Sequence, residues 1–175
     1  TVTVEDTTKP IITLNGLATI NLHIGDSYSE LGATWSDVVD GSGTVTATSG
    51  TVNTNKVGVY AITYDKTDSH SNVAIQVTRT ITVSDVSAPV INKLTDITTE
   101  ATSSSGAVMT YSSVTATDDA DGVIPATCTP TSGSTFPLGS TAVICTATDS
   151  SNNVRFGTAL IITVEDKTIP TIDSH

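Results

Sequence analysis

Apolar and polar side chains alternate along this chain in short runs that are separated by turn residues. The runs "GVYAITY" at 58–64 and "TRTITVS" at 78–84 place apolar residues at every second position, as strands with one buried face require. No segment has the periodicity of an amphipathic helix. The pattern predicts strands at 11–14, 19–24, 28–35, 43–49, 57–65 and 73–84, and again at 90–94, 97–101, 108–118, 124–130, 141–149 and 154–165.

Six or more short strands in each stretch of about 80 residues are typical of a β-sandwich of immunoglobulin type. We therefore expect an all-β fold of two tandem immunoglobulin-like β-sandwiches, with no helix longer than a turn. The short segment "DVSA" before Pro89 leaves little slack between the two, because a residue that precedes proline is held in extended backbone. For this reason we expect an elongated arrangement.

One stretch of sequence occurs three times, as "VEDTTKPII" at 4–12, "VSDVSAPVI" at 83–91 and "VEDKTIPTI" at 164–172. A period of about 80 residues is long enough for each repeat to bury a core of its own. A shift of 81 residues, which needs no gap from Asp37 to Asp85 and which we call the repeat alignment, also superimposes acidic and turn residues: Asp37 on Asp118, Asp40 on Asp121, Gly41 on Gly122, Asp68 on Asp149 and Asn72 on Asn153.

The repeat predicts the domain boundaries. Residues 1–5 would be the last strand of a preceding repeat, 6–84 a first domain, 85–165 a second domain, and 166–175 the start of a following repeat. The alternative is that both ends are ragged, disordered termini. On the first interpretation the chain is a segment of a longer array, and its terminal strands pair with neighbouring repeats of the same polypeptide or with neighbouring subunits of an assembly, which includes a homopolymer.

Composition narrows the class of protein and its partners. Asp and Glu number 18 against 7 Lys and Arg, a formal charge of −11, and Thr, Val, Ser and Ile dominate over helix formers. Nucleic acid is not an expected partner, because phosphate binding needs clustered cations. No apolar run approaches the roughly 20 residues that cross a bilayer, so we expect no membrane insertion. No signal peptide is present, which for a secreted protein again indicates an internal segment.

Two parts of the sequence resemble known extracellular modules. The segment "STFPLGSTAVICTATDSSNN" at 134–153, with "TATDDADG" at 115–122, resembles a hyalin repeat, which is an immunoglobulin-like module of extracellular proteins. It departs from the family at Asn152, where hyalin repeats usually carry Gly. The segments 28–41 and 57–64, "YSELGATWSDVVDG" and "VGVYAITY", resemble the bacterial or archaeal immunoglobulin-like repeats of large surface proteins. The resemblances imply tandem modules outside a cell, and they imply no chemistry.

Cys128 and Cys145 are the two cysteines of the chain, and each stands at the core-facing position of a predicted strand. The hyalin-repeat resemblance implies that they form a disulfide. Two buried free thiols are the alternative, which an extracellular location disfavours. A zinc site is less favoured still, because two cysteines without a nearby histidine do not complete four ligands.

Acidic loop residues provide the strongest chemical signal. In an immunoglobulin-type sandwich the loops after the second and the sixth strands lie at the same end as the N-terminus, so carboxylates from both loops should meet there. Hard oxygen ligands of this kind suit Ca²⁺. The candidate ligands are Asp85, Asp118, Asp119, Asp121, Asp149 and Asn152 for the second domain, and Asp6, Asp37, Asp40 and Asp68, with Asn72 as a further candidate, for the first.

Ordinary turns are the alternative to a calcium site, because Asp and Asn favour turns that face water. The first site should be the weaker of the two, since Val38 replaces Asp119 and removes one ligand. His70 stands in the corresponding loop of the first domain, where it could touch a metal or face solvent.

Three classes of function remain open. The chain is a structural segment of a stalk, filament or surface layer, an adhesive module that binds a glycan or a protein, or an accessory domain of a secreted enzyme. No Ser, Cys and His spacing suggests a catalytic triad, so the chain itself is not expected to be an enzyme. We favour the structural segment, because the acidic loops are placed at the linkers and no aromatic cluster remains for recognition.

Overall fold

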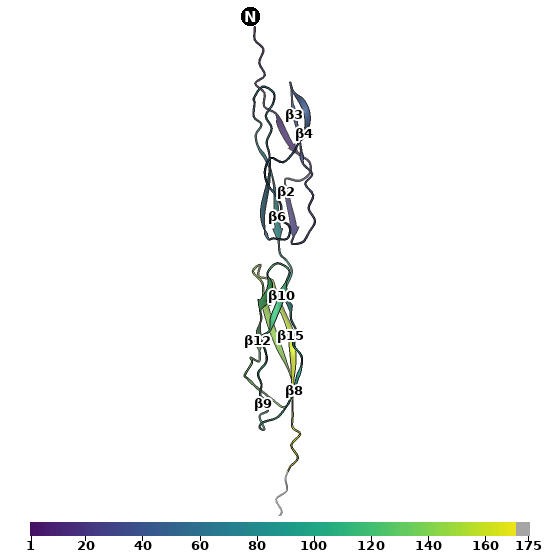
Figure 1. Cartoon of the computed structure of the whole chain (residues 1–175), viewed down its shortest axis with the longest axis vertical. Helices are drawn as coiled ribbons and strands as arrows, with labels where there is room; N and C mark the ends of the chain where they lie inside the picture. Colours follow the sequence, from purple (N-terminus) through teal and green to yellow (C-terminus); the bar gives the residue numbers. More distant parts are fainter. Residues whose placement is uncertain (171–175) are drawn as a thin grey trace, which may run out of the picture. The chain divides into compact units, whose positions relative to one another are not determined.

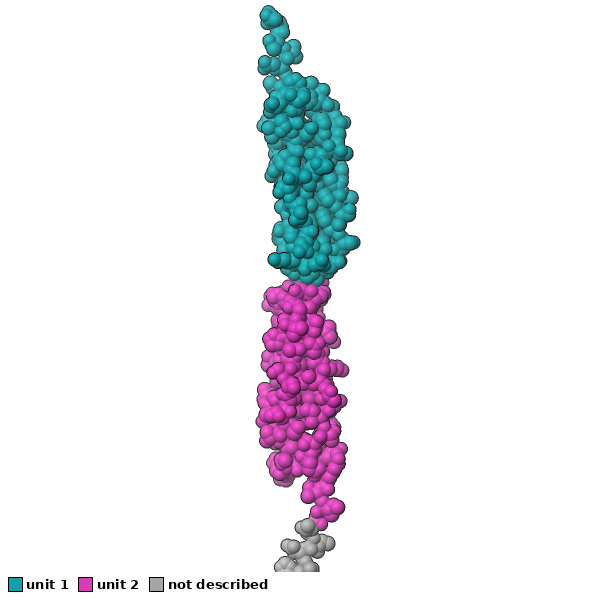
Figure 2. Space-filling model, in the orientation of Figure 1, with its two compact units in different colours: residues 1–85 teal, residues 86–175 magenta. Residues whose placement is uncertain are grey.

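The computed structural model describes residues 1–170, and it divides into the two compact units Thr1–Asp85 and Val86–His175 (Figure 2). All regular elements of the described residues are strands, which confirms the all-β class. None of these residues forms a helix that is long and apolar enough to cross a membrane. Half of the predicted start of a following repeat, residues 171–175, lies outside the described residues.

The first unit is a sandwich of two three-stranded sheets. Its strands are β1 (Ile11–Leu14), β2 (Thr19–His23), β3 (Ala33–Asp37), β4 (Gly41–Val45), β5 (Gly58–Tyr64) and β6 (Val77–Ser84). One sheet has the order β1-β3-β4 and the other the order β2-β6-β5. Figure 1 labels the neighbours β3 and β4 of the first sheet and β2 and β6 of the second. The pairing of β2 with β6 is parallel, and the other pairings are antiparallel. The consecutive strands β1 and β2 belong to different sheets, because β1 pairs with β3 and β2 pairs with β6.

The second unit repeats this topology with two longer strands, β14 and β15, a fourth strand in one sheet and one small added sheet. Its strands are β7 (Val90–Ile91), β8 (Ile97–Glu100), β9 (Ala107–Val108), β10 (Thr115–Asp118), β11 (Gly122–Pro125), β12 (Thr127–Thr129), β13 (Thr135–Phe136), β14 (Gly139–Thr148) and β15 (Val154–Glu165). The sheets have the orders β11-β10-β7 and β12-β14-β15-β8, and β9 pairs with β13. As in the first unit, one pairing of this unit's described strands is parallel: it joins β8 to the last strand, β15.

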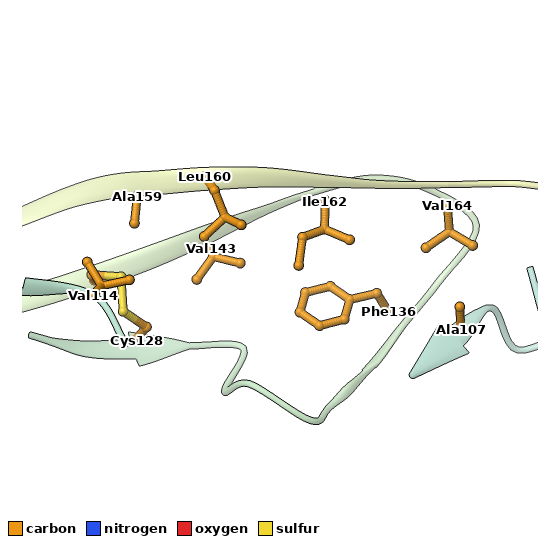
Figure 3. Packing of buried hydrophobic residues seen from close by; sticks show 10 residues of the cluster. Ala107, Val114, Cys128, Phe136, Val143, Ala159, Leu160, Ile162 and Val164 are labelled. Carbon is orange, nitrogen blue, oxygen red and sulfur yellow. A yellow bond between two sulfur atoms is a disulfide. The ribbon is translucent and has the colours of Figure 1, made fainter. Parts of the chain in front are cut away.

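Alternating side chains of β14 and β15 form the core of the second unit. Val143, Phe136 and Ile162 are fully buried between the sheets, with Leu160 and Val164 beside them (Figure 3). Cys128 on β12 and Cys145 on β14 are directly opposed in the sheet and form a disulfide, as the hyalin-repeat resemblance implies. Large apolar side chains and the covalent bridge together fill this core.

The first unit has a more polar core. Ile81, Val83 and Tyr64 are buried, but so is Arg79, whose position corresponds to Leu160 in the repeat alignment. The Arg79 guanidinium forms an ion pair with Glu30 and donates a hydrogen bond of 2.6 Å from Nη2 to the backbone carbonyl of Asn15. A buried charge needs such partners, because an unpaired one is strongly destabilising.

The predicted strands agree best with the structure where the alternation is longest. The prediction at 154–165 coincides with β15, whereas the prediction at 28–35 is realised only from Ala33 onward. Gly32 has φ 73°, a left-handed conformation that ends an extended run, and its N–H donates to the Glu30 side chain. The strand predicted at 108–118 is also interrupted, and only β9 and β10 form at its two ends. Between them the Tyr111 N–H donates to the Ser132 side chain instead of to a neighbouring strand. Residues 1–10 form no strand, and none of residues 1–170 pairs with them in a sheet.

Candidate metal centres

Three aspartates from separate segments of the first unit meet at one point. Asp6 precedes β1, Asp37 ends β3, and Asp68 lies in the loop between β5 and β6. One ligand oxygen from each lies within 4.8 Å of the others. Two oxygens on opposite sides of a Ca²⁺ ion, each bound at about 2.4 Å, are separated by about this distance. We refer to Asp6, Asp37 and Asp68 as the first cluster.

Short-range hydrogen bonds fix the orientation of each carboxylate in the first cluster. Asp37 Oδ1 accepts hydrogen bonds from the backbone N–H groups of Val39 at 2.8 Å and Asp40 at 3.0 Å. Asp68 Oδ1 accepts from the N–H groups of His70 at 2.9 Å and Asn72 at 2.7 Å, and its Oδ2 accepts from the Asn72 side chain at 2.8 Å. These are the Asx turns that Asp favours, so the turns that hold the loops also position the carboxylates.

Asp6 has one oxygen that accepts no hydrogen bond. Its Oδ1 accepts from the N–H and the hydroxyl of Thr8, at 3.0 and 2.5 Å. Its Oδ2 is buried without a donor, and only 4% of the side chain is exposed. A carboxylate that is removed from water and lacks a donor on one oxygen is costly to maintain.

The second cluster has the same geometry and is more deeply buried. Asp85, Asp118 and Asp149 correspond to the first cluster in the repeat, and they are only 7%, 6% and 6% exposed. One ligand oxygen from each again lies within 4.8 Å of the others. Asp85 follows β6, Asp118 ends β10, and Asp149 follows β14.

Asp118 resembles Asp6 in having one oxygen without a donor. Its Oδ1 accepts hydrogen bonds from the N–H groups of Ala120 at 2.9 Å and Asp121 at 3.0 Å, while its Oδ2 is buried with no hydrogen-bond partner. Asp149 is held by Asn153, whose backbone N–H and side-chain amide donate at 2.8 and 2.9 Å. Each cluster therefore contains one aspartate, Asp6 or Asp118, whose Oδ1 accepts hydrogen bonds from neighbouring residues while its buried Oδ2 accepts none.

Asp40 and Asp121 lie outside the clusters and connect two loops. Asp121 accepts hydrogen bonds from the backbone N–H and the hydroxyl of Ser150 at 2.5 and 2.8 Å, and Asp40 accepts from Ser69 in the same way at 2.6 and 2.7 Å. These bonds from Ser69 and Ser150 hold the pKa of each aspartate below its ordinary value. Both residues are candidate ligands in the sequence, and in the structure their carboxylates bind a serine of the neighbouring loop.

The remaining candidates of the second domain also lie outside its cluster. Asp119 is exposed and accepts a hydrogen bond of 3.2 Å from the Ser87 hydroxyl. Asn152 has φ 69° and stands in the turn, where its backbone N–H donates to the carbonyl of Asp149. A left-handed conformation favours Gly, which accounts for the glycine that hyalin repeats usually carry there. Asn153, not Asn152, is the side chain that holds Asp149.

No Lys or Arg offsets the charge of the clusters. Among residues 1–170, Lys and Arg form ion pairs only with Glu30 and Glu165, and the one basic group beside a cluster is His70, with Nδ1 3.7 Å from Asp6 Oδ2. Burial acts to raise the pKa of Asp68, but hydrogen bonds from Asn72 and the His70 backbone outweigh it, so the pKa lies below its ordinary value. Ionised carboxylates this close repel one another, and a bound cation would relieve that repulsion.

Both units have the same sandwich topology, and each carries an equivalent aspartate cluster, so the chain consists of tandem immunoglobulin-like modules. Residues 12–83 match the family described as bacterial surface protein, Ig-like domain, and residues 84–164 match the HYR domain. The matches agree with the resemblances found in the sequence and identify an extracellular or cell-surface protein. Neither family is catalytic. The HYR match begins at Ser84 and so includes Asp85, which is the last residue of the first compact unit.

Two curated relatives align with nearly the whole chain. Hyalin of Strongylocentrotus purpuratus is 32% identical over 98% of this chain, and hyalin of Lytechinus variegatus is 34% identical over 97%. The chain spans only 15% and 33% of those two proteins. Among solved structures, the lipoprotein BT2262 from Bacteroides thetaiotaomicron aligns over 86% of this chain and 80% of its own, with 16% identity and a TM-score of 0.38, a similarity too low to support an inference.

The sequence contained a signal for the donors that hold the clusters. Asp68, Ser69 and Asn72 in "DSHSN" correspond to Asp149, Ser150 and Asn153 in "DSSNN". In each segment the aspartate enters the cluster, the serine binds the neighbouring loop and the last asparagine orients the aspartate. This repeated spacing distinguishes ligand candidates from supporting residues.

Proposed function

We propose that this chain is a structural segment of a larger cell-surface protein, and that each aspartate cluster binds Ca²⁺. The observation that carries the proposal is the buried Oδ2 of Asp118, which accepts no hydrogen bond while two further buried aspartates lie within 4.8 Å. A coordinated cation supplies the missing partner. The same arrangement at Asp6 in the first cluster supports the same conclusion.

The donor set is suited to calcium. Ca²⁺ takes six to eight oxygen ligands, and three carboxylates supply between three and six of them, with water and backbone carbonyls completing the shell. Sites of this kind in extracellular modules bind with a Kd of about 10⁻⁴ to 10⁻³ M, so millimolar calcium outside a cell would fill them.

Calcium would have a mechanical effect, because each cluster joins three segments of chain. In the second domain the ion would fasten the segment that contains Asp85 to the loops that carry Asp118 and Asp149. Asp85 lies where one domain passes into the next along the chain, so fixing it would remove rotational freedom at the linker. We propose that the segment is thereby rigidified in calcium and loosened without it, through repulsion among the carboxylates.

The proposal is tested by calcium titration of the purified two-domain chain. Melting of the first domain is followed by the fluorescence of Trp35, the only tryptophan, and melting of both domains by calorimetry. Saturating calcium should stabilise each domain by about 1–3 kcal/mol through mass action. Asp37→Asn should abolish the response of the first domain only, and Asp118→Asn that of the second only. Asp26→Asn, which removes an exposed carboxylate outside both clusters, should leave both responses intact.

Rigidity is measured separately, with two spin labels on opposite domains. Calcium should narrow the distribution of distances between the labels in the wild type and not in Asp118→Asn. If neither domain of the wild type responds to millimolar calcium, the carboxylates are solvated turns and the proposal fails. If the domains are stabilised but the distance distribution is unchanged, the mechanical part alone is rejected.

A further inference from the structure

The two clusters differ in one residue type that changes which metal they should prefer. On the basis of the cation sites proposed above, we propose that the first cluster is a mixed carboxylate–imidazole site that binds a borderline divalent ion such as Zn²⁺ through His70, whereas the second cluster is an all-oxygen site. Imidazole favours Zn²⁺ and related transition ions, whereas carboxylates and water favour Ca²⁺.

The distance between His70 and Asp6 supports this assignment. His70 Nδ1 lies 3.7 Å from Asp6 Oδ2, the buried oxygen that accepts no hydrogen bond. Two ligand atoms on a tetrahedral Zn²⁺, each bound at about 2.0–2.1 Å, are about 3.4 Å apart. An ion that contacts both atoms would therefore need them to approach by about 0.3 Å. Asp37 and Asp68 complete the three-aspartate cluster, and His70, which stands outside it, would become the fourth ligand that zinc prefers by turning its ring toward the cluster.

The backbone of His70 is fixed by hydrogen bonds, whereas its ring is about half exposed to solvent. Its N–H donates to Asp68 Oδ1 at 2.9 Å, and the neighbouring Ser69 is held by Asp40 through two hydrogen bonds. The side chain is 48% exposed, and its Nδ1 lies 3.1 Å from the Ser69 hydroxyl. Metal binding would exchange that weak contact for a coordinate bond without moving the loop.

The second cluster lacks the imidazole and has more negative charge around it. Ser151 occupies the position that corresponds to His70, and Asp119 occupies the position of Val38. The second cluster therefore offers no imidazole, and the exposed Asp119 adds negative charge nearby without joining the cluster. Both differences favour calcium at the second cluster, whereas the imidazole of His70 favours a transition ion at the first.

The test is zinc titration by calorimetry of the wild-type chain, His70→Ala, His23→Ala and Ser151→His, with the chain's fold verified by melting without metal. The wild type should bind one Zn²⁺ tightly, and His70→Ala should weaken that binding at least about tenfold. His23→Ala, which removes a histidine on β2, should change nothing. Ser151→His should create a second tight site, because it gives the second cluster the missing ligand.

Nuclear magnetic resonance identifies the ligand directly. Zinc should shift the ring resonances of His70 and leave those of His23 in place. Equal zinc affinity in the wild type and His70→Ala, or an unshifted His70 ring, would overturn the inference while leaving calcium binding intact. Conversely, zinc binding that depends on His70 in a chain whose domains do not respond to calcium would support this inference and reject the proposed calcium sites.

Discussion

Arg79 and Glu30 form an ion pair within the first domain, at the position where the second domain has an apolar core. The Arg79 side chain is fully buried, whereas that of Glu30 is 22% exposed. In the repeat alignment Arg79 corresponds to Leu160, which is buried in the apolar core of the second domain. The same sandwich is thus completed by a charged network in one repeat and by apolar packing with a disulfide in the other.

Replacing Arg79 by Leu should destabilise the first domain strongly. The substitution removes the partner of Glu30 and of the Asn15 carbonyl. Loss of one member of a buried pair costs about 3–5 kcal/mol, and we expect the lower end, about 3 kcal/mol, because Glu30 keeps some contact with water. Urea unfolding followed by Trp35 fluorescence measures the loss.

The double variant Arg79→Leu with Glu30→Gln provides the control for this prediction. It removes both charges, so it should be more stable than Arg79→Leu alone. Unfolding of the second domain should be unchanged in both variants. A double variant no more stable than the single one would show that packing, not the unpaired charge, causes the loss.

Tyr64 should make the first domain sensitive to alkaline pH. Burial raises the pKa of Tyr64 to about 12, and the nearby Glu30 carboxylate acts in the same direction. A folded-state pKa above the unfolded value of about 10 stabilises the domain below about pH 10, and this contribution is lost as the pH rises through about 12. The melting temperature of the first domain should therefore fall across this interval, and that of Tyr64→Phe should fall less steeply. Parallel curves for the two proteins would contradict the assignment.

Reduction of the Cys128–Cys145 disulfide should destabilise the second domain alone. The bridge closes a sequence separation of 17 residues, for which the chain-entropy model gives about 3 kcal/mol. The first domain has no cysteine and serves as an internal control. Calorimetry with and without reductant should show one shifted and one unshifted transition, and a shift of both would mean that the domains do not unfold independently.

The sequence was sufficient to predict the class of fold, and the physical reason is visible in β15. In its second half the buried residues Leu160, Ile162 and Val164 alternate with less buried ones, and the repeat indicates that the two domains share one topology. The repeat alignment also brought Asp37 and Asp68, with their counterparts Asp118 and Asp149, into the candidate sites.

Individual roles within the loops could not be predicted in this way. Asp118 and Asp121 stand close together in one turn, yet the first points into the cluster and the second binds Ser150 in another loop. Chain spacing does not specify which side of a turn each side chain takes. The ion pair of Arg79 could not be predicted for a related reason, because its partner Glu30 is 49 residues away along the chain.

The neighbours Asn152 and Asn153 should respond in opposite ways to substitution. Asn152 adopts φ 69° in the turn, so Asn152→Gly should leave the stability of the second domain unchanged or raise it by up to about 1 kcal/mol, with the calcium response retained. Asn153→Ala removes the amide that donates to Asp149 Oδ2 at 2.9 Å. It should cost about 1.5–3 kcal/mol, the value of a hydrogen bond to a charged group, and weaken calcium binding because Asp149 loses its orientation.

The first domain offers a matched control for this pair of substitutions. Asn72→Ala removes the equivalent amide from Asp68, so it should reproduce the effect of Asn153→Ala in the first domain and leave the second untouched. Melting temperatures of all three variants are measured with and without calcium. They distinguish an asparagine that orients an aspartate from one that itself binds the ion. Loss of the calcium response in Asn152→Gly would show instead that the Asn152 side chain binds the ion, and it would return that residue to the set of candidate ligands.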